Sequence, residues 1–254
     1  MTDAPMPAHY ADPDLVALYD LEGRRGDEES FYLPPAFARR LRVLEAGCGT
    51  GFLALVLAGQ GHKVTGLDPA TSMLATARAK PGADAVTWVE GDMRAFARPD
   101  RFDLIVLTGH AFQVLETDAD IAATLACFER HLAPGGWLTF ESRNPLVEGW
   151  RTWTREQSAM TLEHPRLGPV EAYWTGQPST EPEIIDSVAH YHFTRTDNRK
   201  ISRSRLRFAP QATLVRLLTE AGFSDQIWYG NWDRSPVGPS SPELIVEARR
   251  AGGL

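Results

Sequence analysis

The chain has 254 residues, of which 43% are hydrophobic and 23% are charged, a composition close to that of ordinary soluble globular domains. It excludes a membrane-spanning protein, because no apolar run approaches the length needed to cross a bilayer. The formal net charge of −7 disfavours a nucleic-acid substrate, because polyphosphate would be repelled, and makes a small molecule the expected partner.

The N-terminal residues and the cysteines narrow the class further. Residues 1–10 have neither the basic start nor the apolar run of an export signal, so a cytoplasmic protein is expected. Cys48 and Cys127 are too few for a disulfide framework and lie in no cluster of metal-ligand spacing. Both are expected to be free thiols. The sequence leaves open whether the protein is a monomer or a homodimer.

From Leu41 onward, apolar runs alternate with helical patterns, which is typical of a mostly parallel α/β sheet. Asp118 is expected to cap the third helix of this series. The predicted strands are 42–45, 63–67, 86–90, 103–107 and 137–141, and the predicted helices are 53–58, 71–80 and 118–131.

The second half of the chain changes character. Short alternating runs in 150–208 predict an antiparallel β insertion, and a helix at 213–221 precedes two antiparallel strands at 223–229 and 243–248. The expected organisation is therefore an N-terminal helical lid (1–40), a ligand-binding core (41–149), the antiparallel insertion (150–208) and a C-terminal helix with the last two strands of the core (209–254).

A glycine-rich turn, Gly47-Cys48-Gly49-Thr50-Gly51, follows the first strand, where missing side chains let a ligand approach the backbone. The dinucleotide fingerprint requires a small residue where Phe52 stands, which disfavours a nicotinamide cofactor. Glu45 would repel a diphosphate but attract the ammonium and sulfonium groups of S-adenosyl-L-methionine (SAM). The turn therefore favours SAM.

Two acidic residues end the next strands. Asp68 is placed to accept both hydroxyls of a ribose, a role shared by NAD and SAM sites. Asp92 is placed to accept the exocyclic amine of adenine, with Met93 covering the ring. The alternative for each aspartate is a structural cap of a helix or turn.

Successive segments of the chain, 43–51, 66–69, 91–93 and 132–136, resemble the motifs of class I SAM-dependent methyltransferases in order and spacing. The resemblance covers roughly 41–144 and returns at 221–246. It implies a doubly wound, Rossmann-like seven-stranded sheet of order 3-2-1-4-5-7-6, with the glycine turn around the methionine end of SAM. The expected SAM-binding residues are Tyr19, Tyr32, Glu45, Gly47, Cys48, Gly49, Asp68, Pro69, Met73, Asp92, Met93, Thr108 and Gly109.

Residues after the fourth and fifth strands are candidates for the acceptor site. His110 is a candidate general base, because its reference pKa lies near neutrality, and its alternative is a packing role. Arg143 is a candidate for binding an acceptor carboxylate or phosphate, and its alternative is an ion pair with Glu141 or a contact with a neighbouring loop.

The insertion offers weaker signals. His190 and His192 should share one strand face, but no third ligand is evident, so no metal site is expected. Arg203, Arg205 and Arg207 are expected to form a solvated row.

The sequence as a whole predicts a SAM-dependent methyltransferase that acts on an oxygen or nitrogen atom of a small molecule. The alternatives are a SAM- or nucleoside-binding protein without turnover and, less favoured, an NAD-dependent oxidoreductase.

Overall fold

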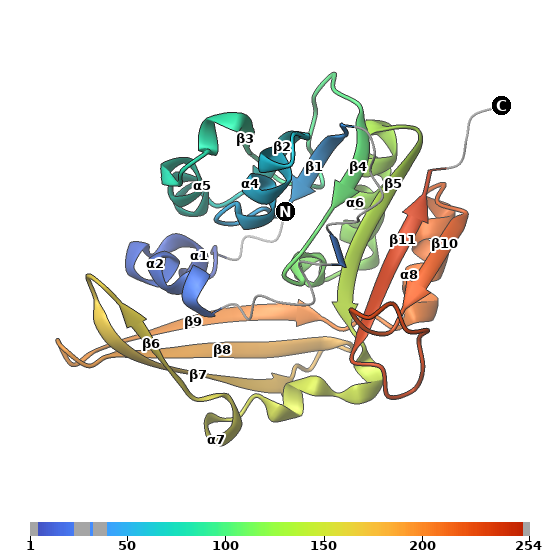
Figure 1. Ribbon diagram of the computed structural model, residues 1–254. Coiled ribbons are helices and arrows are strands. Elements are labelled where there is room, and N and C mark those ends of the chain that lie inside the picture. Colours follow the sequence, from blue (N-terminus) through green and yellow to red (C-terminus); the bar gives the residue numbers. More distant parts are fainter. Residues whose placement is uncertain (1–4, 23–30, 33–39, 251–254) are drawn as a thin grey trace.

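The computed structural model describes residues 5–22, 31–32 and 40–250, and contains two β-sheets. The larger sheet has seven strands in the order β10-β11-β5-β4-β1-β2-β3, which confirms the predicted order. Figure 1 shows the four-stranded sheet below it, with helices α1 and α2 beside both. The fold class predicted from the sequence, a mostly parallel α/β sheet with an antiparallel β insertion, is therefore confirmed.

The strands and helices of the larger sheet follow the predicted sequence of elements. Its strands are β1 (Arg42–Ala46), β2 (Lys63–Asp68), β3 (Val86–Glu90), β4 (Phe102–Val106), β5 (Leu132–Arg143), β10 (Asp225–Tyr229) and β11 (Glu243–Arg249). The helices are α4 (Phe52–Gly59), α5 (Thr71–Ala79), α6 (Asp118–His131) and α8 (Gln211–Glu220). Strands β1 to β5 are parallel, and β11 is antiparallel to both β5 and β10.

Strand β1 shows why its sequence is apolar throughout. Val43 and Leu44 are both fully buried, yet they belong to different hydrophobic clusters on opposite faces of the sheet. The cluster of Val43 includes Leu57 of α4, whereas the cluster of Leu44 includes Phe128 of α6 and Leu218 of α8. Helices cover both faces, so the sheet is doubly wound.

The insertion forms an antiparallel sheet of β6 (Met160–His164), β7 (Gly168–Pro178), β8 (Ile184–Phe193) and β9 (Asn198–Arg207), in that order. Its inner face packs on α2 (Pro13–Glu22), which follows the short α1 (Ala8–Ala11). Leu15 and Leu18 of α2 lie in one hydrophobic cluster with Val170 and Tyr191. The N-terminal helices are thus held between the two sheets (Figure 1).

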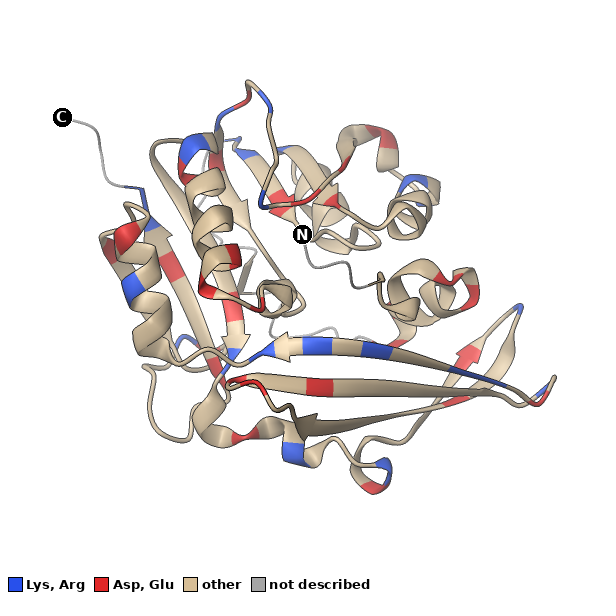
Figure 2. Ribbon diagram, turned by 180° about the vertical axis from the view of Figure 1, so that it is seen from behind, with Lys and Arg blue, Asp and Glu red and all other residues tan. Residues whose placement is uncertain are grey.

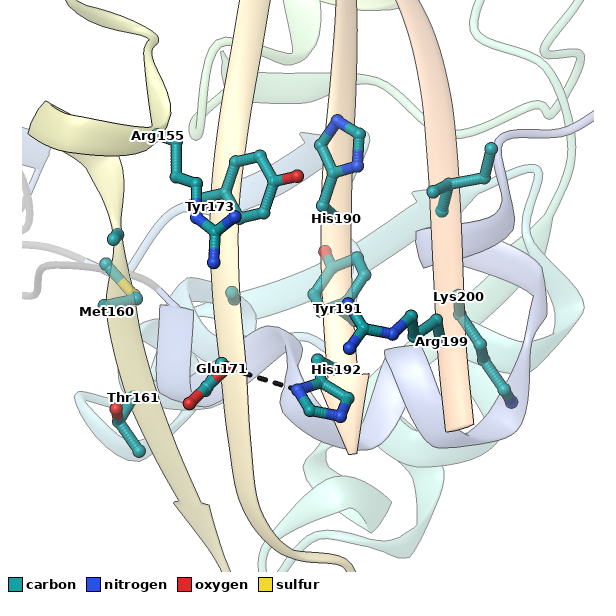
Figure 3. Close-up of a pocket in the computed structure, with 13 residues that line it drawn as sticks. Arg155, Met160, Thr161, Glu171, Tyr173, His190, Tyr191, His192, Arg199 and Lys200 are labelled. Atoms are coloured by element: carbon teal, nitrogen blue, oxygen red, sulfur yellow. Dashed lines mark hydrogen bonds and ion pairs between the residues drawn. The ribbon is translucent and has the colours of Figure 1, made fainter. Parts of the chain in front are cut away.

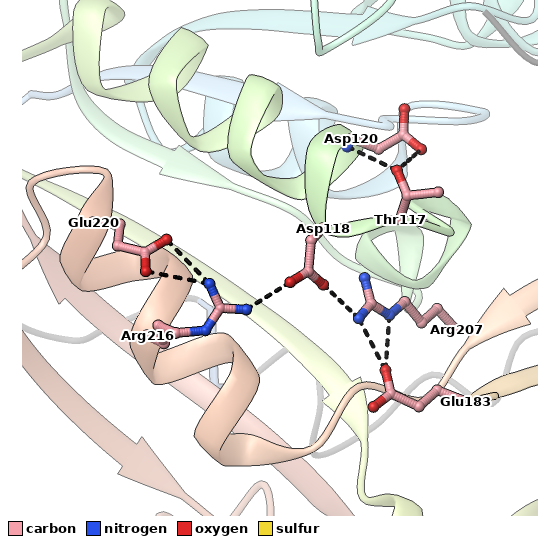
Figure 4. A network of polar contacts seen from close by, with 7 residues as sticks. All are labelled: Thr117, Asp118, Asp120, Glu183, Arg207, Arg216 and Glu220. Atoms are coloured by element: carbon pink, nitrogen blue, oxygen red, sulfur yellow. Dashed lines mark hydrogen bonds and ion pairs between the residues drawn. The ribbon is translucent and has the colours of Figure 1, made fainter.

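One prediction near α6 is wrong. The side chain of Thr117, not of Asp118, caps the helix, because it accepts the backbone N–H of Asp120 at 3.0 Å. Asp118 instead pairs with Arg207 at 2.6 Å and with Arg216 at 2.5 Å (Figure 4).

The arginine row of β9 is not uniformly solvated. Figure 2 shows basic residues spaced along this edge strand, which contacts the short helical segment Ala111–Val114 after β4. Arg203 is exposed, but Arg205 pairs with Glu116 at 2.8 Å, and Arg207 is only 9% exposed. The predicted row fails because an edge strand that packs on another element turns charged side chains toward acidic partners.

The structure bears on the two cysteines and on membrane-spanning helices. Cys48 and Cys127 are buried free thiols, as predicted. None of the helices in 5–22, 31–32 and 40–250 combines the length and apolar character that a bilayer crossing requires.

Candidate functional site

The glycine turn lies between β1 and α4, at the carboxyl end of the parallel strands. Gly47, Gly49 and Gly51 have φ values of +73°, +51° and +76°, a region that only glycine adopts without strain. Backbone N–H groups of Gly47 and Cys48 donate to the Leu67 carbonyl at 2.8 and 3.0 Å. A Cβ at Gly47 would lie 2.8 Å from the Cβ of Ala111, so space as well as backbone geometry requires glycine.

Asp68 joins this turn to the end of β2. Its Oδ2 accepts the N–H of Gly49 and its Oδ1 accepts the N–H of Ala70, both at 2.8 Å. Burial raises the pKa of Asp68, while these two hydrogen bonds oppose the rise. The carboxyl group is thus fixed in place, and each oxygen keeps a lone pair for a ligand.

Side chains from separate elements surround the turn. A Cβ at Gly49 would lie 3.7 Å from both the Tyr19 ring and the Met73 Cε, and would fill the space between them. The Met93 Cε is 3.8 Å from the corresponding position at Gly47. The Tyr19 hydroxyl is also 4.0 Å from that position at Gly109, which places α2 across the turn.

Glu45 lies beneath the turn and is 2% exposed. Burial raises its pKa to about 8, against hydrogen bonds from the Ala54 backbone and the Thr108 side chain. Its Oε2 has no hydrogen-bond partner within the described part of the chain. A positively charged ligand above the turn would favour the ionised form of this carboxyl group.

Three further predicted residues have other surroundings. Burial raises the pKa of the Cys48 thiol, whose Sγ lies 3.0 Å from the Cβ position of Gly66, and Pro69 is exposed. Asp92 pairs with Arg94 at 2.5 Å, and hydrogen bonds from that guanidinium lower the Asp92 pKa. The predicted contact of Asp92 with adenine therefore competes with an ion pair that the sequence did not indicate.

His110 and Tyr32 meet at Glu141 of β5. The carboxylate of Glu141 accepts the backbone N–H of His110 at 2.6 Å and the hydroxyl of Tyr32. His110 has φ +59°, and its Nε2 lies 3.0 Å from a carboxylate oxygen of Glu243. Tyr32 packs in the hydrophobic cluster on the α4 side of the sheet.

Arg143 fits one of its predicted alternatives, a contact with a neighbouring loop. It donates to the Gln113 Oε1 at 2.7 Å, and its guanidinium lies 5.2 Å from the ring centre of Trp153. Gln113 follows the loop after β4, so the loops after β4 and β5 are linked here.

Tyr10, Glu22 and Tyr191 gather with Tyr19 in a group called here the phenol cluster, and only Tyr19 of the four was a predicted site residue. The Tyr10 and Tyr19 ring centres are 6.1 Å apart. Charges of Asp68, Arg143 and Glu22 all act on the pKa of Tyr10, which burial raises to about 12. Two features of the sequence indicate this grouping. Glu22 follows Tyr19 by three residues, which places both on one face of the helix, and Tyr191 lies between His190 and His192, which places it on the opposite face of β8.

A cavity of about 430 Å³ lies on the opposite face of the four-stranded sheet. Figure 3 shows His190, His192, Tyr173 and Arg155 on this outer face, with the N-terminal helices behind the sheet. His192 pairs with Glu171 at 3.2 Å, and His190 stacks on Tyr173 with ring centres 4.3 Å apart. Within the described residues, no three His, Cys, Asp or Glu side chains are grouped to hold a metal ion.

Comparisons with known proteins identify the family. A family model described as a methyltransferase domain matches residues 43–136. A putative methyltransferase of Geobacillus sp. (strain WCH70) is 33% identical over 190 residues, 72% of this chain and 74% of that protein. A glycine/sarcosine N-methyltransferase of Halorhodospira halochloris is 28% identical over 236 residues, 90% of this chain and 82% of that protein.

Other relatives match over shorter stretches. The chain spans less than half the length of a putative methyltransferase of Bacillus subtilis (47%, at 30% identity) and of a ubiquinone biosynthesis O-methyltransferase of Thiobacillus denitrificans (44%, at 34% identity). Among solved structures, the CcbJ methyltransferase of Streptomyces caelestis has a TM-score of 0.74 at 21% identity, covering 96% of this chain and 98% of that chain.

The chain belongs to the class I SAM-dependent methyltransferases, a family whose members use SAM as methyl donor. The residues at the glycine turn fit this cofactor. The space that a Cβ at Gly49 would fill and the fixed carboxylate of Asp68 lie together at the carboxyl end of β1 and β2.

Proposed function

We propose that this protein transfers the methyl group of SAM to a nitrogen or oxygen atom of a small molecule. The observation that carries the proposal is the glycine turn, where backbone at positive φ lies bare beside the fixed carboxylate of Asp68. A relative that matches 90% of this chain, the glycine/sarcosine N-methyltransferase of Halorhodospira halochloris, supports a small acceptor.

The residues around the turn would bind and orient SAM. In this proposal Asp68 holds the ribose hydroxyls, Asp92 and Met93 contact the adenine, and Glu45 favours the positive charge of the methionine end. SAM supplies a methyl group on a positively charged sulfur, which is already a good leaving group. The protein therefore needs alignment and exclusion of water more than it needs acid or base groups.

Helix α2 is suited to exclude water from this site. Tyr19 lies across the turn, and Leu15 and Leu18 fix the helix on the four-stranded sheet. We therefore propose that α1 and α2, which belong to the predicted lid (1–40), cover the donor while the four-stranded sheet supports the acceptor side.

The sequence predicts His110 as a candidate general base. Its Nε2 is held by Glu243, an arrangement that would stabilise a protonated imidazole. If His110 is the base, His110→Ala should slow turnover and leave SAM affinity unchanged, and an unaltered turnover rate would remove it from the mechanism.

The proposal extends to location and partners. We propose a cytoplasmic enzyme, as the two free thiols suggest, that acts on a metabolite and not on nucleic acid, as the net charge of −7 suggests.

Calorimetric titration with SAM and with NAD, followed by transfer of labelled methyl from SAM into a metabolite extract, tests the function. SAM binding and incorporation of label are expected. Binding of NAD without SAM would contradict the cofactor, and SAM binding without incorporation at saturating SAM would favour a binding protein.

A further inference from the structure

Glu22 ends α2 and faces Tyr191 of β8 inside the phenol cluster. Burial raises the pKa of both groups, and each is near enough to the other for a hydrogen bond between them to lower the pKa of Glu22 and raise that of Tyr191. Even so, the Glu22 Oε1 and the Tyr191 Oη are both buried, and neither makes a well-formed hydrogen bond within residues 5–22, 31–32 and 40–250. Buried polar atoms without well-formed hydrogen bonds are rare in folded proteins, and a catalytic role or a bound water, ion or ligand is among the reasons that account for them.

The phenol cluster reaches the glycine turn. Tyr19 lies 3.7 Å from the Cβ position of Gly49, and the charges of Asp68 on β2 and Arg143 on β5 both act on Tyr10 of α1. The cluster therefore extends from the predicted methyl donor site to the inner face of the four-stranded sheet, where an acceptor would lie.

The charges of this region favour a cation. Burial raises the pKa of Tyr19, and the nearby Tyr10, Asp68, Glu22 and Asp20 raise it further, although Asp20 is itself paired with Lys80 at 2.6 Å. Arg143 is the one cation among the described residues that acts on Tyr10. Phenol rings attract an ammonium group through their faces, and a carboxylate attracts it through its charge. Burial raises the pKa of Glu22 to about 7, close to neutrality.

We propose that the acceptor is an amine and that Glu22 binds its ammonium group and removes the proton that blocks methylation. This inference rests on the proposed methyl transfer. An ammonium nitrogen has no free electron pair; when its N–H bond breaks, the pair stays on nitrogen and the proton forms an O–H bond with Glu22. Tyr191 donates to the second carboxylate oxygen. An alkyl alcohol is too weak an acid for a carboxylate to deprotonate, so the cluster selects amines over alkyl hydroxyls.

Glu22 suits this role better than His110. The His110 ring is occupied by Glu243 at 3.0 Å, whereas one oxygen of Glu22 is unpaired in the described structure. The two assignments predict different pH profiles, which makes them separable.

The acceptor class is tested with labelled SAM and two portions of one metabolite extract, one untreated and one with its amines blocked by acetylation. We expect label in the untreated extract and at most a tenth as much in the blocked extract. Label retained in full after acetylation would overturn the amine assignment while leaving methyl transfer intact. SAM binding without label in either portion would instead count against the proposed function.

The residue is tested by Glu22→Gln, with Glu163→Gln on exposed strand β6 as the matched control. Initial rates at dilute untreated extract report kcat/KM for the acceptor. We expect Glu22→Gln to lower this rate about 100-fold or more and to remove the fall in rate below about pH 7, with the Kd for SAM unchanged within twofold. The proposal would be overturned if Glu22→Gln kept the wild-type rate and pH profile. It would also be overturned if the fall in rate below about pH 7 disappeared in His110→Ala and not in Glu22→Gln.

Tyr191→Phe is a second test of the proposed site, and it removes a hydroxyl group without removing a charge. Its control is Tyr173→Phe on the outer face of the same sheet (Figure 3). We expect the first to lower the acceptor rate roughly 3–10-fold, the usual effect of one lost hydrogen bond, and the second to leave it unchanged. Equal effects of both changes would contradict a specific role for the inner face.

Discussion

Asp68 at the glycine turn and Glu22 in the phenol cluster are both buried carboxyl groups whose pKa burial raises, but their surroundings differ. Asp68 receives two backbone N–H groups at 2.8 Å, and its position is fixed by the parallel sheet itself. Among the described residues, no backbone N–H group donates to the Oε1 atom of Glu22, which is buried without a hydrogen-bond partner. In the proposed function, the donor side is thus built before ligand binds, whereas the acceptor side keeps polar groups that a ligand would satisfy.

The first prediction adds one methyl group to the glycine turn on the proposed donor side. Gly51→Ala should lower the free energy of unfolding by about 2–4 kcal/mol, because the new Cβ would overlap the ring of Trp88 at a residue with φ +76°. Gly82 has φ +82° with open space around it, so Gly82→Ala measures the cost of the backbone conformation alone. We expect it to lower the free energy of unfolding by only about 1 kcal/mol. Denaturant unfolding of both variants measures the difference, and equal losses would show that the contact with Trp88 is unimportant.

The second prediction removes the fixed carboxylate. Asp68→Ala should weaken SAM binding by about 1–3 kcal/mol, the usual cost of losing a charged hydrogen-bond partner. Calorimetric titration measures it, and Asp84→Ala, at an exposed aspartate next to β3, serves as the control. A SAM affinity unchanged by Asp68→Ala would contradict the ribose role.

The third prediction concerns Glu22 and pH. Its pKa rises from 4.5 to about 7 on folding, so the folded protein binds the proton more tightly than the unfolded chain. The stability from this group is complete below pH 4.5 and is lost as the pH rises through 7. Between pH 5 and pH 8, wild type should therefore lose roughly 1–3 kcal/mol more unfolding free energy than Glu22→Gln. Parallel curves for the two proteins, measured without SAM, would show that Glu22 ionises in the folded state as it does in the unfolded chain.

The fourth and smallest effect tests how the two sheets are joined. Arg207 of β9 pairs with Asp118 at 2.6 Å and with Glu183 at 2.9 Å, and it is largely buried (Figure 4). Arg207→Met should cost about 1–2 kcal/mol of stability, since both acidic partners remain partly exposed to water. Arg203→Met, on the exposed part of the same strand, should cost almost nothing. A thermal unfolding midpoint that is the same in both variants would mean that the ion pairs do not hold β9 in place.

The elements of the fold were accessible from the sequence where local patterns were strong. Strand β2 was predicted at 63–67 and found at Lys63–Asp68, and α6 was predicted and found at 118–131. The cap of α6 was wrong because Thr117 and Asp118 are both good capping residues, and only the arginines that meet Asp118 in the folded protein decide between them.

The sequence by itself determined the family and the proposed donor side, because the glycine turn, Asp68 and the residues between them lie close along the chain and carry their geometry in local backbone requirements. Only the tertiary structure pointed to the proposed acceptor side. Glu22 and Tyr191 are separated by most of the chain, and a carboxyl group becomes chemically distinctive only when distant segments bury it without a partner.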